Sequence, residues 1–231
     1  MDAGVIAALI AALASLGLAC LNTYWSLRQR DRERRIEAKA ELARYRKPLL
    51  EAAADLGARI DNIQHNQFDA YFKSDDRSDI AIKSTLYRFA RYFATLEILR
   101  SQLTFLEFER ASETKKVAGL IANIEGALTS DSFGERFMLW REEQRAIGES
   151  TLDRDESGLL RCIGFATFVG EFERREAQWF QRFQTDLKQD GAAASSKRLG
   201  RVQVHLQSLV RELDEEERYQ HSDEPPIWLR R

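Results

Sequence analysis

Cysteine, histidine and proline are all scarce in this chain. Its 231 residues include only 2 cysteines and 3 histidines. Cys20 lies in an apolar N-terminal run and Cys162 lies far from it, so no framework of intramolecular disulfides is predicted, as suits a reducing compartment. His65, His205 and His221 are not arranged at metal-ligand spacing, and Cys-x-x-Cys is absent, so the sequence predicts no metal site.

The common glycine-rich motifs are absent as well. Gly-x-Gly-x-x-Gly and the Walker-type Gly-Lys-Ser/Thr would supply backbone N–H groups to phosphates, and Gly-x-Ser-x-Gly would present a nucleophilic serine. None of the three occurs in the chain. The sequence therefore predicts no catalytic residue and no cofactor, and it favours a non-enzymatic protein over an enzyme.

Neither sign of charge dominates. Lys and Arg number 35 and Asp and Glu number 37, which gives a formal net charge of -2 and a pI near 6.0. Nonspecific nucleic-acid binding needs many cations that neutralise phosphates, so no nucleic-acid partner is indicated. With 3 prolines and 44% hydrophobic residues, the composition is that of a folded protein.

What the chain does contain is a long N-terminal run without charge. No Asp, Glu, Lys or Arg occurs between Ala3 and Leu27. As a helix, the part up to Trp25 would span about 34 Å, which is enough for a hydrocarbon core of about 30 Å. Tyr24 and Trp25 then lie where interfacial aromatic residues are expected. We predict a transmembrane anchor in residues 1–27, with the lipid bilayer as a partner.

Basic residues follow this run at once. Residues 28–47 hold nine basic and four acidic side chains without glycine or proline, which predicts a charged juxtamembrane helix or linker. The other flank offers only Met1 and Asp2, so the positive-inside tendency predicts an external N-terminus and a body on the cytoplasmic face of the cell (inner) membrane. Two interpretations of these basic residues stay open: they only set the topology, or they also attract anionic lipid headgroups.

A cleaved secretory signal is the main alternative to an anchor. Such a signal needs a positive segment before the apolar run, and the only charged side chain there is Asp2. Leu18-Ala19-Cys20 faintly resembles a lipoprotein cleavage site, but Gly17 stands where such sites usually place leucine. An uncleaved anchor is therefore favoured.

Small residues recur at four-residue steps within the anchor, at Ala7, Ala11, Ser15 and Ala19. In a bilayer, such rows let two helix backbones approach closely. Two interpretations stay open: a homo-oligomer that forms through the anchor, or an anchor that is merely rich in alanine.

Helical periodicity continues beyond the anchor. Residues 48–215 predict an all-α, multi-helix bundle in a single domain, with no strand alternation. Pro48 suits the first turn of a helix that ends near Tyr71, and the polar residues 73–79 predict a loop. The next helix, over 82–106, is apolar on so wide an arc that we expect it to be central.

Polar and small residues divide the second half of the body. A helix is predicted over 117–128, a break with capping residues at 130–132, and another helix around 137–149. A polar loop is expected at 151–157. Further on, the small residues 191–196 form a linker before a last amphipathic helix that ends near Leu213, and a charged C-terminal tail occupies 216–231.

Between that loop and that linker we predict one long helix. It runs from Gly158 to Leu187 and is bent near Gly170. Cys162, Ala166 and Gly170 are four residues apart, which predicts close helix packing. Thiol chemistry is not favoured, because no histidine lies near Cys162 in sequence to lower its pKa.

One carboxylate stands in an apolar setting. Glu97 lies within Phe93-Ala94-Thr95-Leu96-Glu97-Ile98-Leu99, and an unpaired carboxylate is costly to bury. It is therefore expected to have a cationic partner, for which Arg59 and Arg145 are the candidates. The three residues predict either a structural ion pair or a polar pocket that binds a small ligand.

Three stretches carry a resemblance: Lys47-Pro48-Leu49-Leu50 and the residues after it to Ile63, then Glu142–Glu149, and then Cys162–Ala166. They are similar to uncharacterised, single-pass, membrane-anchored, all-helical bacterial proteins, with a likeness that covers Pro48 to Leu187. That group has no assigned activity. The resemblance therefore implies the architecture and no catalytic residue or cofactor.

Two classes of function follow. The favoured one is a membrane-tethered interaction, scaffold or sensor module that acts as a homo-oligomer or with a protein partner. The alternative is an enzyme or small-ligand sensor with a polar pocket built around Arg59, Glu97 and Arg145. A pocket that encloses these groups would favour the alternative, and a tightly packed bundle would favour the module.

Overall fold

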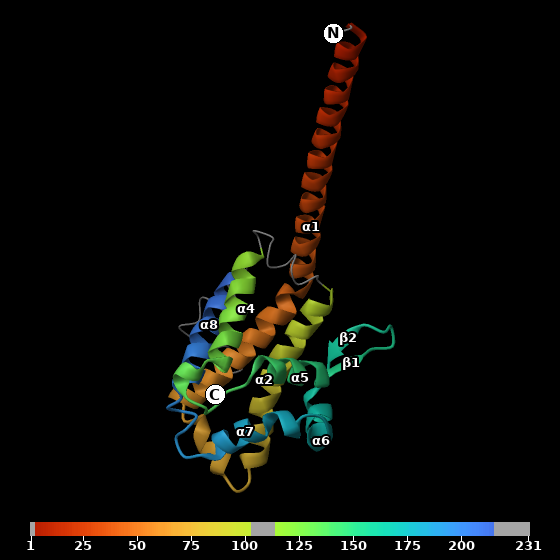
Figure 1. The fold of residues 1–231 in the computed structure, drawn as a ribbon. Helices are drawn as coiled ribbons and strands as arrows, with labels where there is room; N and C mark the ends of the chain where they lie inside the picture. Colours follow the sequence, from red (N-terminus) through yellow and green to blue (C-terminus); the bar gives the residue numbers. More distant parts are fainter. Residues whose placement is uncertain (1–2, 103–113, 215–231) are drawn as a thin grey trace.

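A computed structural model describes the backbone of residues 3–102 and 114–214 (Figure 1). Side chains are described for most positions from Leu18 onward within these ranges. The described chain is mostly helical, so the all-α prediction is confirmed. The predicted tail 216–231, the end of the predicted central helix at 103–106 and the side chains of Ala7, Ala11, Ser15 and Ala19 lie outside the described residues.

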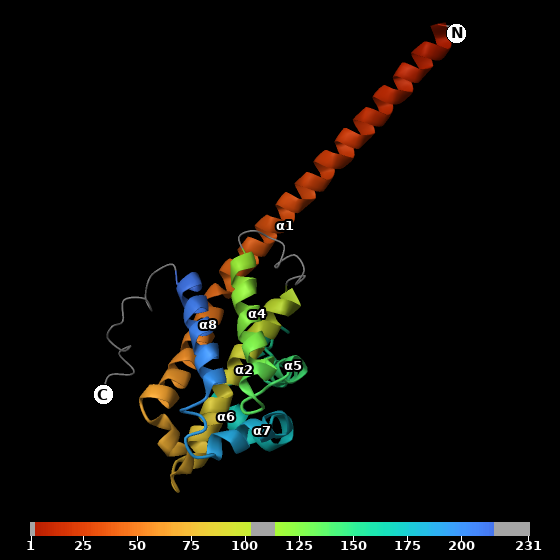
Figure 2. The ribbon, with the colours of Figure 1, turned by 60° about the vertical axis from the view of Figure 1, so that its left-hand side comes forward.

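A single helix, α1 (Ala3–His65), projects from the body and also forms part of it (Figures 1 and 2). Residues 28–47 are helical within it, and Pro48 lies inside the helix and not at its start. Proline removes one helical hydrogen bond, and the exposed position of Pro48 leaves its ring facing solvent. Among the residues whose side chains are described, no helix is long and apolar enough to cross a bilayer.

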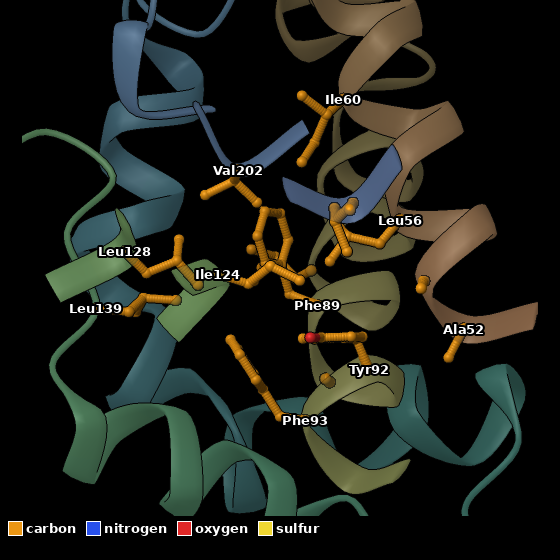
Figure 3. Close-up of a cluster of buried hydrophobic side chains, with 14 of the residues drawn as sticks. Ala52, Leu56, Ile60, Phe89, Tyr92, Phe93, Ile124, Leu128, Leu139 and Val202 are labelled. Carbon is orange, nitrogen blue, oxygen red and sulfur yellow. The ribbon is translucent and has the colours of Figure 1, made fainter. Parts of the chain in front are cut away.

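Four helices lie side by side around the core: the end of α1, α2 (Ser78–Gln102), α4 (Lys115–Thr129) and α8 (Lys197–Leu213) (Figure 2). Leu56, Phe89, Ile124 and Val202 come from these four elements, are at most 1% exposed and point toward one another (Figure 3). Burying each such side chain contributes about 2 kcal/mol. The other helices, α5, α6 and α7, contact α2, so its central position is confirmed.

The helix predicted around 137–149 begins later, as α5 (Arg141–Ser150). Phe137 has a positive φ of 56° and cannot enter a helix in that conformation. It is held there because its side chain is fully buried and its N–H donates to Asp186 Oδ2 at 2.7 Å. A buried aromatic side chain therefore overrides the local helical pattern.

A β-hairpin replaces the predicted loop at 151–157 and the start of the predicted long helix. β1 (Leu152–Arg154) pairs antiparallel with β2 (Leu160–Cys162). The turn is made by Asp155, whose Oδ1 accepts hydrogen bonds from Ser157 N at 2.9 Å and Leu159 N at 3.0 Å. These bonds replace those of a first helical turn. The prediction of no strands was wrong here, because three-residue strands are too short to show alternation.

The remainder of the predicted long helix is two helices, α6 (Phe165–Arg175) and α7 (Ala177–Lys188). They meet at Glu176 and not at Gly170, so the predicted bend was misplaced. Glu176 is 1% exposed, and its carboxylate oxygens lie 2.9 Å from Ser150 Oγ and 3.1 Å from Thr151 Oγ1. Cys162 lies in β2 and so shares no helical face with Ala166 and Gly170, contrary to the predicted packing motif.

Arg198, the second residue of α8, joins that helix to the end of α4. Its side chain is 1% exposed, and Nη1 donates to the carbonyls of Ala127 at 2.8 Å and Leu128 at 2.7 Å. Nε donates to the Arg136 carbonyl at 2.9 Å, and Nη2 donates to that of Gly134. The last carbonyls of a helix lack intrahelical partners and carry partial negative charge. One cation therefore satisfies the end of α4 and the loop after it.

The approach of α5 to α2 is set by Gly148. A Cβ atom added there would lie 2.8 Å from both the Glu97 Cγ atom and the Phe93 carbonyl oxygen. We expect Gly148→Ala to push the two helices apart and to lower the free energy of unfolding by about 2 kcal/mol, as overpacking does. Urea-induced unfolding of the full-length protein measures this change.

Gly119→Ala is the matched control. Gly119 lies in α4, is exposed, and has nothing within 4 Å of an added Cβ. The substitution should be neutral or stabilise by up to about 1 kcal/mol, because alanine favours helix more than glycine does. Equal effects of the two substitutions would show that the helices are not in close contact at Gly148.

Candidate functional site

The first candidate site is a buried ion-pair network around Glu97. Glu97 on α2 and Glu125 on α4 are each 7% exposed, and Arg100 lies between them. Arg100 Nη1 donates to Glu97 Oε1 at 2.5 Å, and Nη2 donates to Glu125 Oε1. Burial alone would lower the pKa of Arg100, but the charges of Glu125 and Glu97 and the bonds to them outweigh burial and raise it, so the charge of Arg100 is retained. The expected cationic partner of Glu97 is therefore present, and it is a residue one turn further along the same helix.

Arg145 also reaches this network. Its Nε lies 3.5 Å from Glu97 Oε1, but its side chain is 58% exposed and the contact is at the edge of the site. The structure thus brings together two of the three residues predicted to share a site. The network joins α2, α4 and α5 at the level where Gly148 lets α5 approach.

Close packing surrounds the network. Gln144 Nε2 donates to the Leu139 carbonyl at 2.8 Å and lies 3.3 Å from the Glu125 carbonyl, which ties α5 to the end of α4. Tyr92 is 0% exposed, and burial raises the pKa of its phenol far above the ordinary range. The Tyr92 hydroxyl and Gln144 Oε1 are buried without a hydrogen-bond partner among the described residues, but both carboxylates are paired. The arrangement is therefore suited to holding helices together.

Arg59 lies elsewhere, near the turn between α1 and α2. It contacts Phe68 of the 3₁₀ helix η1 (Phe68–Lys73), and the surface beside it includes Ser84 near the start of α2. Glu97 lies thirteen residues beyond Ser84 on α2, which is about 20 Å along a helix. Arg59 therefore takes no part in the Glu97 network.

An open groove of about 470 Å³ lies beside Arg59. Its lining is aromatic, aliphatic and basic, and consists of Arg59, Phe68, Tyr71, Arg77, Ile80, Ala81 and Ser84. The left-handed conformation of Gln67 (φ 56°) reverses the chain after α1, so that η1 lies against α1 and α2. Phe72, 2% exposed, anchors η1 in the core.

Cys162 shows no sign of activation. Its thiol is partly buried, and burial raises the pKa of that thiol to about 11. The neighbouring Tyr87 has its pKa raised to about 12, also chiefly by burial, and its hydroxyl donates to the Ile163 carbonyl at 2.9 Å. A thiol with so high a pKa is almost entirely protonated at neutral pH and is a poor nucleophile.

Sequence reasoning missed three of these residues. Arg100 follows Glu97 at the i,i+3 spacing that favours a helical ion pair, so this contact could have been found. Glu125 lies between apolar residues of α4, a setting like that of Glu97. The contact of Phe68 with Arg59 gave no local signal, because it depends on the reversal at Gln67.

No protein-family model matches the chain, and neither a curated protein nor a solved structure shows significant similarity to it. The resemblance to single-pass helical bacterial proteins therefore stays a prediction. Within the described part of the chain, no group of three or more His, Cys, Asp and Glu side chains is placed to hold a metal ion. What the chain does must accordingly be inferred from its own geometry.

The Glu97 network predicts unequal roles for its two arginines. We expect Arg100→Met to lower the free energy of unfolding by about 3–5 kcal/mol, because it removes the buried cation from both carboxylates and leaves Glu97 with only the edge contact from Arg145. Arg145→Met removes a largely exposed partner and should cost less than about 1 kcal/mol. Urea unfolding of the two full-length variants gives both values.

A rescue experiment separates charge from packing. One explanation of the cost is that Arg100→Met leaves buried carboxylates without their cation. In that case, adding Glu97→Gln and Glu125→Gln should restore part of the lost free energy of unfolding, because the site then holds no buried negative charge. No recovery in the triple variant would mean that Arg100 acts through the packing of its alkyl chain.

Proposed function

We propose that this protein is a membrane-tethered helical module that presents its body at a fixed distance from the cytoplasmic face of the inner membrane, where it acts as a scaffold, interaction or sensor domain. One observation carries the proposal: the same continuous helix, α1, contains the uncharged run 3–27 and the buried core segment that begins at Leu49. The backbone between these two parts is helical throughout, so the orientation of one is coupled to that of the other.

Exposed apolar side chains support a lipid partner for the N-terminal part of α1. Leu18, Leu21 and Trp25 are 69%, 56% and 66% exposed, and Tyr24 is 54% exposed. Large apolar side chains gathered on one projecting helix indicate a surface that is covered by something else. The abrupt change to arginine at Arg28 favours a bilayer boundary over a protein partner at this position.

The length of the exposed helix sets the geometry of the tether. Between Arg28 and Pro48, α1 rises about 30 Å, and the described side chains of this part are mostly exposed. A helical stalk of this kind holds the body off the membrane and leaves its sides open to a protein partner. Enzymatic activity is not required by any feature of this arrangement.

Insertion into the membrane is tested with full-length protein. We expect the wild-type protein to stay in the membrane fraction after an alkaline carbonate wash. The double variant Leu9→Arg, Leu13→Arg should instead be washed into the soluble fraction, because each central arginine costs about 3 kcal/mol of insertion free energy. Val204→Arg, which adds the same charge at a 53% exposed position of α8, should remain with the membranes. Extraction of the wild-type protein by carbonate would contradict the tether.

Self-association through the anchor is the second part of the proposal. Light scattering on full-length protein in detergent should give a discrete oligomer, and Ala11→Ile with Ser15→Ile should reduce it to a monomer by blocking close helix approach. Gly17→Ile is the control, since helical spacing places Gly17 away from the row of small residues. A monomeric wild-type protein would rule out the homo-oligomer and leave the tether unaffected.

A further inference from the structure

The groove beside Arg59 contains a buried cation that forms no ion pair with the described residues. Arg59 is 9% exposed, its Nη1 has no hydrogen-bond partner, and among the described residues it forms no ion pair. An unpaired buried charge is costly, so such a residue needs a reason to be there. Its one contact of note is with Phe68, whose ring centroid lies 3.8 Å from Arg59 Cζ.

The acidic side chains nearest to Arg59 along α1 are engaged elsewhere. Asp55 accepts a hydrogen bond of 2.6 Å from Arg91 Nη1. Asp61 accepts a hydrogen bond of 2.7 Å from Gln203 Nε2, and its Oδ1 also lies 3.0 Å from His65 Nδ1. None of the side chains that line the groove is acidic. Asp55 attracts Arg59 without forming an ion pair with it, so the guanidinium group can still take an anion from solution.

Further positive charge surrounds the groove. Arg77, which is exposed, lines it, and Arg88 lies close enough to repel Arg59. Burial, and secondly Arg88, lower the pKa of Arg59 to about 9, which leaves its guanidinium charged at neutral pH. The apolar part of the groove is formed by Phe68, Tyr71 and Ile80, of which the last two are 45% and 43% exposed.

We propose that this groove binds a small anion, a carboxylate or phosphate monoester that also carries an aromatic or short aliphatic group. Arg59 and Arg77 would take the anionic group, because guanidinium groups form strong charge-assisted hydrogen bonds with both kinds of oxyanion. The rings of Phe68 and Tyr71, whose centroids are 5.3 Å apart, would contact the apolar group. A volume of about 470 Å³ suits such a molecule.

The position of the groove favours a soluble ligand over a lipid headgroup. It lies at the turn between α1 and α2, at the end of the body opposite the projecting N-terminal part of α1 (Figure 1). Arg28 and Arg59 are separated by about 46 Å of helix. Under the proposed tether, the anchoring membrane is therefore out of reach, although binding at the groove itself does not depend on the tether.

Calorimetric titration of full-length protein in detergent with phenyl phosphate tests the proposal. We expect a dissociation constant of about 1 mM or tighter, with no binding of the neutral analogue benzyl alcohol. Arg59→Gln should weaken phenyl phosphate binding at least about ten-fold. Arg174→Gln, which removes a 73% exposed arginine of α6, is the control and should bind as the wild type does. No binding to the wild type, or equal binding by Arg59→Gln, would overturn the proposal.

A second measurement avoids any substitution. Phenylglyoxal modifies arginine side chains, and mass spectrometry assigns the modified positions. Phenyl phosphate should protect Arg77, the exposed arginine of the groove, from modification in the wild-type protein, while Arg174 continues to react. No protection of Arg77, or equal protection of Arg174, would show that the anion binds elsewhere or not at all, even if Arg59→Gln fails to fold.

Binding measurements in lipid nanodiscs distinguish a soluble anion from a lipid headgroup. If the ligand is soluble, phenyl phosphate should bind with the same affinity in discs of phosphatidylcholine and in discs that contain phosphatidylglycerol. Competition from phosphatidylglycerol would identify the occupant as a lipid headgroup and overturn its assignment as a soluble molecule. Failure of the tether would appear in the carbonate wash and not in these titrations.

Discussion

Burial of one face of α1 between α2 and α8 is the constraint on which the rest of the structure depends. Leu49, Ala53, Leu56 and Ile60 on this face are all 0% exposed. Their contacts hold the end of a 63-residue helix in the body. Because the helix continues unbroken through this face, the burial also fixes where the exposed part of α1 leaves the body. Pro48 removes one helical hydrogen bond at the entry to the core, and the apolar burial that follows it offsets that loss.

Polar contacts inside the bundle fall into two physical kinds. Arg198 and the Glu97–Arg100–Glu125 network are buried with their charges satisfied, so they specify which helix ends meet and at what depth. Arg59 is buried to a similar degree, but its Nη1 has no hydrogen-bond partner and it forms no ion pair with the described residues. Satisfied charges are a normal part of a folded core, whereas an unsatisfied one lowers stability. This contrast is the reason that the Arg59 groove, and not the more densely charged network, is the place where a ligand is inferred.

Periodicity predicted most helices of the body because their apolar stripes are long. The central position of α2, the helix over 117–128 and the last helix up to Leu213 all followed from this pattern. The hairpin at 152–162 did not, because its strands are short and its turn depends on the side chain of Asp155. In the candidate site, the burial of Glu97 and the need for a cation were predicted from its apolar neighbours. Arg100 could also have been named as that cation from its i,i+3 spacing to Glu97. The exclusion of Arg59 could not have been predicted, because it depends on which part of α2 packs against α1.

By itself, the sequence determined the helical class, the uncharged N-terminal run with its basic border, and the presence of a carboxylate that requires a partner. These properties are local, because they depend on residues within a few turns of one another. Only the tertiary structure decided that α1 is continuous into the core, that Arg198 satisfies the end of α4, and that Arg59 faces a groove and not Glu97. Each of these depends on contacts between residues far apart in the chain, which chain reversals such as that at Gln67 bring together.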